Sequence, residues 1–115
     1  MLFFLFGCLS GSSYPNQLAS ATCKTAFKCV SQDELEDYFG YKNIGECISD
    51  IEEITRNDSS YKAWEEGDKD FNKENAEECL AEIYNVQSDS DCTGSMNIFS
   101  FIFDITASEC MQIYE

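Results

Sequence analysis

The sequence predicts an all-α fold, a small bundle of about four helices stapled by three disulfides. Apolar residues recur at i, i+3, i+4 and i+7 along most of the chain, and no stretch shows the alternation typical of a half-buried strand. Seven cysteines in 115 residues are heavy usage for a domain whose length limits its core. We therefore expect one disulfide-rich helical domain over residues 16–115.

The first two helices are expected between Pro15 and Gly40. Apolar positions one helical face apart predict a helix over about 16–30, and they are Cys23, Ala26, Phe27 and Val30. A shorter helical piece follows, with Leu35, Tyr38 and Phe39 as its apolar positions. Gly40 is a natural stop, because glycine readily adopts the left-handed conformation that ends a helix.

The clearest helix signal starts at Asn43. Glu46 stands three residues later as a capping-box partner, and four apolar residues follow on one face, Ile44, Cys47, Ile48 and Ile51. We expect this helix to end in a polar loop over 57–60. One or two helical turns over 61–66 should precede Gly67.

Another helix is expected from Asn72 to just before Gln87. Its apolar face comprises Ala76, Cys79, Leu80, Ile83 and Tyr84. The tail over 97–105 is apolar with little polar interruption, and its helical context favours a helix over a strand. Its aromatic residues Phe99, Phe101 and Phe103 could form an exposed binding patch, although such residues more often belong to the core.

The N-terminal segment carries a second kind of signal. Residues 2–6 are apolar but too few to span a bilayer, and no basic residue precedes them. Leu5-Phe6-Gly7-Cys8 resembles the bacterial lipobox, which implies that Cys8 is the lipidated residue, that 1–7 is a residual signal and that 8–15 is a flexible tether. The alternative is a buried apolar stretch with Cys8 as a core thiol.

With Cys8 set aside, six cysteines remain and permit fifteen pairings. Cys23 and Cys29 are about 240° apart around a helix, so we expect them to bond to different partners. The simplest arrangement pairs Cys29 with Cys47, Cys79 with Cys92, and Cys23 with Cys110. Each such bond contributes roughly 2 to 4 kcal/mol to stability.

The spacing of these cysteines resembles that of lipoproteins from myxobacteria and their relatives. The matching features are Cys23-Lys-Thr-Ala-Phe-Lys-Cys29, the single Cys47 opening a helix, Asn75-Ala-Glu-Glu-Cys79-Leu-Ala-Glu-Ile83, Cys92 after a polar turn, and Cys110. The resemblance implies a lipobox, a short Ser/Gly tether and a small helical domain. Because members of this family are mostly uncharacterised, it implies no activity.

Composition argues against several classes of function. The chain has 22 acidic and seven basic residues, a net charge of -15, and no basic residue after Lys73. Binding to nucleic acid or to anionic headgroups is therefore not expected. Because there is no histidine and no C-x-x-C, the common Ser-His, Cys-His, zinc and thioredoxin-type sites are absent too, and we expect neither an enzyme nor a cofactor.

Two segments begin like calcium-binding loops, but both depart from the pattern. The segment 68–72 is followed by Lys73 where glycine is needed. The second has Gly94 but reaches Ser100 at the twelfth position, which leaves Asp89, Asp91 and Thr93 as weak calcium candidates. Turn formation and helix capping explain both segments more simply.

We therefore expect a lipid-anchored protein of the cell envelope, an outer-membrane lipoprotein or an extracellular protein, with a structural or binding role. Its lipid would attach it to a membrane, and its other partner would be an unidentified protein or small molecule. The alternative is an unanchored secreted binding protein or effector whose discarded leader includes Cys8.

Overall fold

The computed structural model describes residues 9–29, 31–88 and 113–115, and these residues form a helical bundle. The helices are α2 (Tyr14–Cys29), α3 (Gln32–Phe39), α4 (Ile44–Asn57), α5 (Ser59–Glu65) and α6 (Lys73–Ser88). The described residues contain no β-strand, only one isolated bridge between Phe71 and Tyr114. The all-α class is therefore confirmed.

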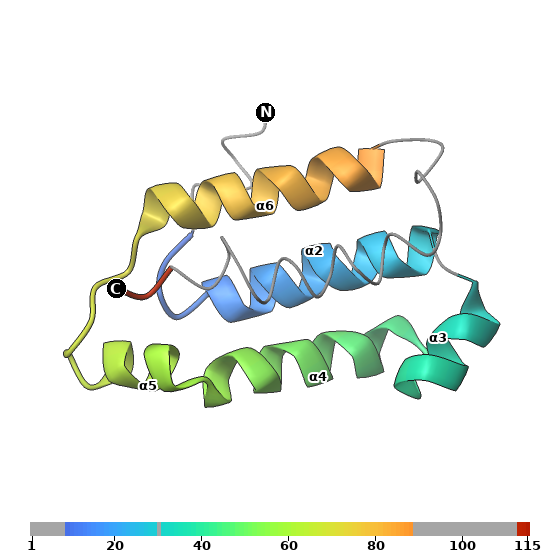
Figure 1. The fold of residues 1–115 in the computed structure, drawn as a ribbon, viewed down its shortest axis with the longest axis horizontal. Helices are drawn as coiled ribbons and strands as arrows, with labels where there is room; N and C mark the ends of the chain where they lie inside the picture. Colours follow the sequence, from blue (N-terminus) through green and yellow to red (C-terminus); the bar gives the residue numbers. More distant parts are fainter. Residues whose placement is uncertain (1–8, 30, 89–112) are drawn as a thin grey trace.

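Helix α2 lies between α4 and α6 in the bundle (Figure 1). The chain turns back after α2, so α4 runs antiparallel to it, whereas α6 runs in the same direction as α2. Most of the α2 surface is buried, and many of its buried side chains are small: Ala19, Ala21, Thr22, Cys23, Thr25 and Ala26. Small side chains let two neighbouring helices approach the same helix closely.

The start of the bundle differs from the expected flexible tether over 8–15. Leu9 is only 6% exposed, and Tyr14 and Pro15 are buried. Helix α2 begins at Tyr14 rather than residue 16, with the Tyr14 amide donating to the Ser10 carbonyl at 2.9 Å. Pro15 is tolerated there because the first amides of a helix have no partner within it. The described residues 9–15 are therefore packed against the bundle.

The predicted boundaries around α3 and α4 are confirmed at Gly40 and Asn43. Gly40 ends α3 with φ 75°, and its amide donates to the Glu36 carbonyl. The Asn43 side chain accepts from the Glu46 amide at 3.0 Å, and α4 begins one residue later. Helix α3 begins at Gln32, directly after Ser31, which caps it by accepting from the Glu34 amide.

The polar loop expected over 57–60 is reduced to a corner at Asp58. This residue ends α4 and also caps α5, since its carboxylate accepts from the Ser60 amide at 3.0 Å. The polar residues after Asp58 therefore start a helix instead of extending a loop. Asn72 caps α6 in a similar way, accepting from the Asn75 amide at 2.9 Å.

The largest apolar cluster joins both ends of the described chain to α2 and α6. Its buried residues are Leu9, Tyr14, Leu18, Ala21, Tyr61, Ala76, Cys79, Leu80, Ile83, Ile113 and Tyr114. The Tyr114 hydroxyl donates to the Gly11 carbonyl at 2.7 Å, and the Asn72 amide donates to the Ile113 carbonyl at 2.6 Å. Residues about a hundred positions apart in sequence thus close the same end of the bundle.

At this end of the bundle, Gly11 packs so closely against the Trp64 ring that no side chain fits there. A Cβ added there would lie 2.2 Å from Cζ2 of Trp64. We expect Gly11→Ala to lower the free energy of unfolding by about 1 to 3 kcal/mol, because the indole must move out of its packed position. Urea titration followed by circular dichroism measures the effect, and an unchanged midpoint would contradict this packing.

Candidate functional site

Many of the residues proposed from sequence lie outside the described part of the chain. They are Cys8, Asp89, Asp91, Cys92, Thr93, Phe99, Phe101, Phe103 and Cys110. The lipidation site, the calcium candidates and the aromatic patch therefore stay predictions. The other four cysteines, on α2, α4 and α6, are described.

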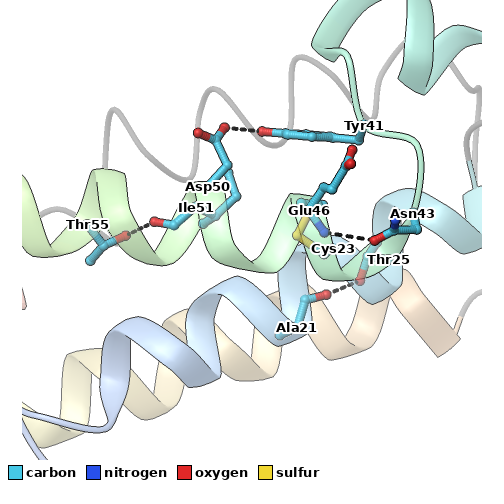
Figure 2. The surroundings of a disulfide bond; sticks show 10 residues. Ala21, Cys23, Thr25, Tyr41, Asn43, Glu46, Asp50, Ile51 and Thr55 are labelled. Carbon is cyan, nitrogen blue, oxygen red and sulfur yellow. Dashed lines mark hydrogen bonds between the residues drawn. A yellow bond between two sulfur atoms is a disulfide. The ribbon is translucent and has the colours of Figure 1, made fainter.

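Cys23 of α2 is bonded to Cys47 of α4, with Cα atoms 5.9 Å apart (Figure 2). The predicted pairs Cys29 with Cys47 and Cys23 with Cys110 are therefore wrong. The simple hairpin assumed for the first pair neglected α3, which separates the end of α2 from α4. Cys29 instead packs with a small apolar cluster that includes Ala26 and Leu35.

Cys29 and Cys79 are also disulfide-bonded, and neither is bonded to a cysteine within the described residues. Cys23 and Cys29 thus have different partners, as the helical geometry predicted. The proposed pair of Cys79 with Cys92 extends outside the described residues and stays a prediction. Every cysteine that the structure describes is in a disulfide.

A small cavity of about 30 Å³ lies where α2, α3 and α4 meet. It is lined by Thr22, Ala26, Leu35, Phe39, Tyr41, Cys47 and Ile51. The Tyr41 ring stacks on Phe39, with centroids 5.7 Å apart, and its hydroxyl donates to the Asp50 carboxylate. Burial and this hydrogen bond raise the pKa of Tyr41. The walls are mostly apolar, and the Tyr41 hydroxyl is held at the edge by Asp50.

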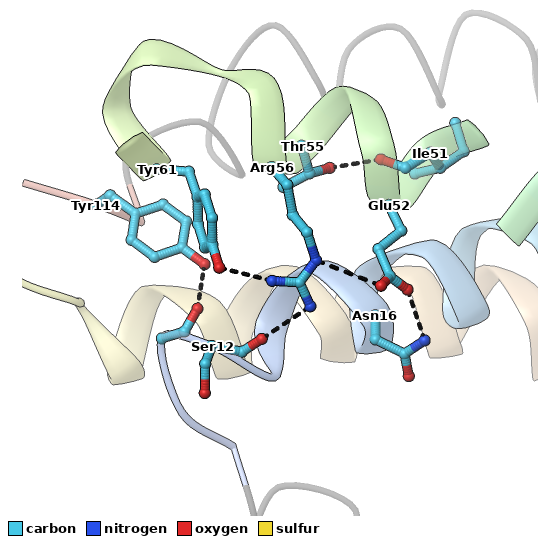
Figure 3. A network of polar contacts seen from close by, with 9 residues as sticks. Ser12, Asn16, Ile51, Glu52, Thr55, Arg56, Tyr61 and Tyr114 are labelled. Atoms are coloured by element: carbon cyan, nitrogen blue, oxygen red, sulfur yellow. Dashed lines mark hydrogen bonds and ion pairs between the residues drawn. The ribbon is translucent and has the colours of Figure 1, made fainter. Parts of the chain in front are cut away.

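The second notable group is a polar network around Arg56, the only arginine in the sequence (Figure 3). Its guanidinium donates to the Glu52 carboxylate at 3.3 Å, to the Tyr61 hydroxyl at 2.6 Å and to the Ser12 carbonyl at 3.1 Å. It also lies 5.5 Å from the centre of the Tyr61 ring. Arg56 thereby links the N-terminal turn, α4 and α5.

Glu52 connects this network to α2. Its other carboxylate oxygen accepts from the Asn16 side chain at 2.8 Å, and the Asn16 hydrogen bond, together with Arg56, lowers the pKa of Glu52. The open surface beside the network is lined by Ser49, Glu52, Glu53, Arg56 and Asn57. Two carboxylates beside one paired guanidinium do not favour a bound anion. The network therefore supports the fold.

The first calcium-like segment, residues 68–72, also makes hydrogen bonds that support the fold. Asn72 caps α6 and donates from its amide to the Glu115 carboxylate at 3.4 Å, while the Asp70 carbonyl accepts from the Glu115 amide. Across residues 9–29, 31–88 and 113–115, no three Asp, Glu, Cys or His side chains gather as a metal-binding group. No helix in these ranges has the length and apolar character needed to cross a membrane.

Comparison with protein-family models, with curated proteins and with solved structures finds no match in any of the three. The resemblance to myxobacterial lipoproteins is therefore carried by the cysteine spacing and lipobox-like segment alone, and the function is argued from the described residues.

Replacing Arg56 by lysine should lower the free energy of unfolding more than replacing Lys62 by arginine changes it. Arg56→Lys removes the planar group that reaches three acceptors, so we expect the free energy of unfolding to fall by about 1 to 2 kcal/mol. The reverse exchange, Lys62→Arg at an exposed position of α5, should change it by less than about 0.5 kcal/mol. Chemical denaturation of both variants tests this, and equal effects would contradict the role of Arg56.

The buried tyrosines predict a loss of stability at alkaline pH. Burial raises the pKa of Tyr14 and of Tyr114, so these phenols keep their protons in the folded state above pH 10, where the unfolded chain loses them. The unfolded state then binds fewer protons, and the free energy of unfolding falls as pH rises.

Absorbance at 295 nm, followed together with circular dichroism, should show a late group of tyrosines ionising as the helices unfold. Ionisation of all six tyrosines near pH 10 with the helices intact would contradict this assignment.

Proposed function

We propose that this chain is a disulfide-stapled helical domain of an extracytoplasmic compartment, with a structural or binding role at a cell envelope, anchored through a lipid on Cys8. The proposed compartment rests on the observation that all four described cysteines are disulfide-bonded. Stable disulfides of this kind belong to oxidising environments such as the periplasm and the cell exterior.

A structural or binding role is favoured over catalysis by how the polar groups are used. Ser31, Asn43 and Asp58 cap helices, and Arg56 pairs with Glu52. These groups satisfy backbone donors or one another. Their contacts serve the rigidity of the bundle, which suits a domain that presents a surface to a partner.

The burial of Leu9 determines how close the proposed lipid anchor on Cys8 would lie to the bundle. Cys8 is covalently next to a residue buried in the main core, and consecutive Cα atoms are about 3.8 Å apart. A lipid on Cys8 would therefore hold the bundle close to the membrane without a spacer. Because the net charge is -15, attraction to anionic headgroups would not help, and the acyl chains would have to supply the membrane affinity.

The second candidate is an unanchored secreted binding protein or effector whose discarded leader includes Cys8. The disulfide-bonded cysteines fit this candidate equally well, because all four described cysteines follow residue 8. The two candidates therefore differ in whether the mature protein keeps Cys8.

The N-terminal peptide of the mature protein distinguishes the two functions. Protein from the native membrane fraction or culture medium is digested without reduction, and its N-terminal peptide is identified by mass spectrometry. The anchored form should begin at a Cys8 that carries acyl chains, and its Cys79 should be bonded to Cys92.

An unmodified N-terminus beyond Cys8 would overturn the anchor and favour the secreted alternative. Detergent phase partitioning provides an independent check. The anchored protein should enter the detergent phase, and Cys8→Ser should move it to the aqueous phase while the Cys23–Cys47 bond stays intact.

A further inference from the structure

The disulfide between α2 and α4 is buried, and α3 and the connection that follows it lie close to Cys47. Cys23 is 0% exposed and Cys47 is 3% exposed, so a reductant in solution does not reach either sulfur directly. Cys47 lines the small cavity at this corner together with Leu35, Phe39 and Tyr41. These three side chains, from α3 and the connection after it, therefore lie around the cavity beside the disulfide.

Helix α3 has a cap at each of its two ends. It carries its own caps, since Ser31 accepts from the Glu34 amide and the Gly40 amide donates to the Glu36 carbonyl. Its described contact with α2 is a small apolar cluster around Leu35 and Ala26. A helix with internal caps and a small packing surface can open locally at less cost than the whole bundle.

One hydrogen bond links the connection after α3 to α4. The Tyr41 hydroxyl donates to the Asp50 carboxylate, one turn beyond Cys47 (Figure 2). The Tyr41 ring also stacks on Phe39 at the end of α3. Tyr41 thus links the last residue of α3 to the helix that holds Cys47. A hydrogen bond to a charged group is among the stronger single contacts in a protein.

We propose that α3 and Tyr41 form a latched cover over the Cys23–Cys47 bond, and that opening of this cover makes the bond reducible while the rest of the bundle stays folded. A dithiol supplies the electrons. Its thiolate attacks one sulfur, the bond between Cys23 and Cys47 breaks, and the departing sulfur takes a proton from water. The second thiol of the reductant then resolves the mixed disulfide and leaves both cysteines as thiols.

The test measures how fast dithiothreitol reduces this one bond in native buffer. Samples are quenched with acid, alkylated, and analysed for the peptides that contain Cys23 and Cys47. Tyr41→Phe keeps the ring and its stacking but removes the latch, so we expect reduction about tenfold faster than in the unmodified protein. Asp50→Asn should accelerate it as well, and the double variant should be no faster than the faster single variant.

Tyr114→Phe is the matched control, because it removes a tyrosine hydrogen bond, to the Gly11 carbonyl, at the opposite end of the bundle. It should leave the reduction rate within about twofold of the unmodified protein. The reduction rate of the unmodified protein should also rise only weakly with added urea, because local opening exposes little surface.

Equal acceleration by Tyr41→Phe and Tyr114→Phe, or a urea dependence as steep as that of global unfolding, would show that the bond is reduced only through complete unfolding. An unchanged rate in Tyr41→Phe would equally overturn the latch.

Discussion

The covalent link between α2 and α4 is the constraint on which the arrangement of the bundle depends. Cys23 is in the middle of the most buried helix, and Cys47 is in the first turn of α4. The bond therefore fixes where α4 starts along α2. From that point α4 runs back along α2 to Asn16 and Ser12, where Glu52 and Arg56 make their polar contacts.

The two ends of the bundle are stabilised by different interactions. At one end, Tyr14, Tyr61, Phe71 and Tyr114 pack as neighbouring rings, and Arg56 connects them to the N-terminal turn. At the other end, the contacts of α3 within the described residues are a small apolar cluster with α2 and the link through Tyr41 to α4. The aromatic end makes global unfolding costly, while the proposed opening of α3 would expose the disulfide without unfolding that end.

Local chemistry of the sequence predicted much of the helical framework. The stop at Gly40 and the start after Asn43 follow from a left-handed glycine and a capping side chain, both of which act within a few residues. Ser31, followed three residues later by Glu34, is a capping pattern too, and it would have indicated that α3 begins directly after Ser31. The corner at Asp58 was mistaken for a loop because polar residues favour loops and helix caps alike.

Features that depend on tertiary packing could not be predicted in this way. The glycine and serines over 10–13 have the composition of a tether, yet Gly11 is needed because the Trp64 ring approaches its backbone. The partner of Cys23 depended on where α3 placed the start of α4. The bond between Tyr41 and Asp50 joins a connection to a helix through a carboxylate that, in sequence, resembles any other surface charge.

A domain of this size with a net charge of -15 has limited means of resisting its own charge repulsion, and cross-links are the most direct of them. We therefore expect the α2–α4 disulfide to be needed for full stability. Urea unfolding of the oxidised protein and of Cys23→Ala/Cys47→Ala measures this directly. The variant should lose about 3 to 4 kcal/mol, the value for a closed loop of some 25 residues, and an unchanged free energy of unfolding would contradict this role of the disulfide.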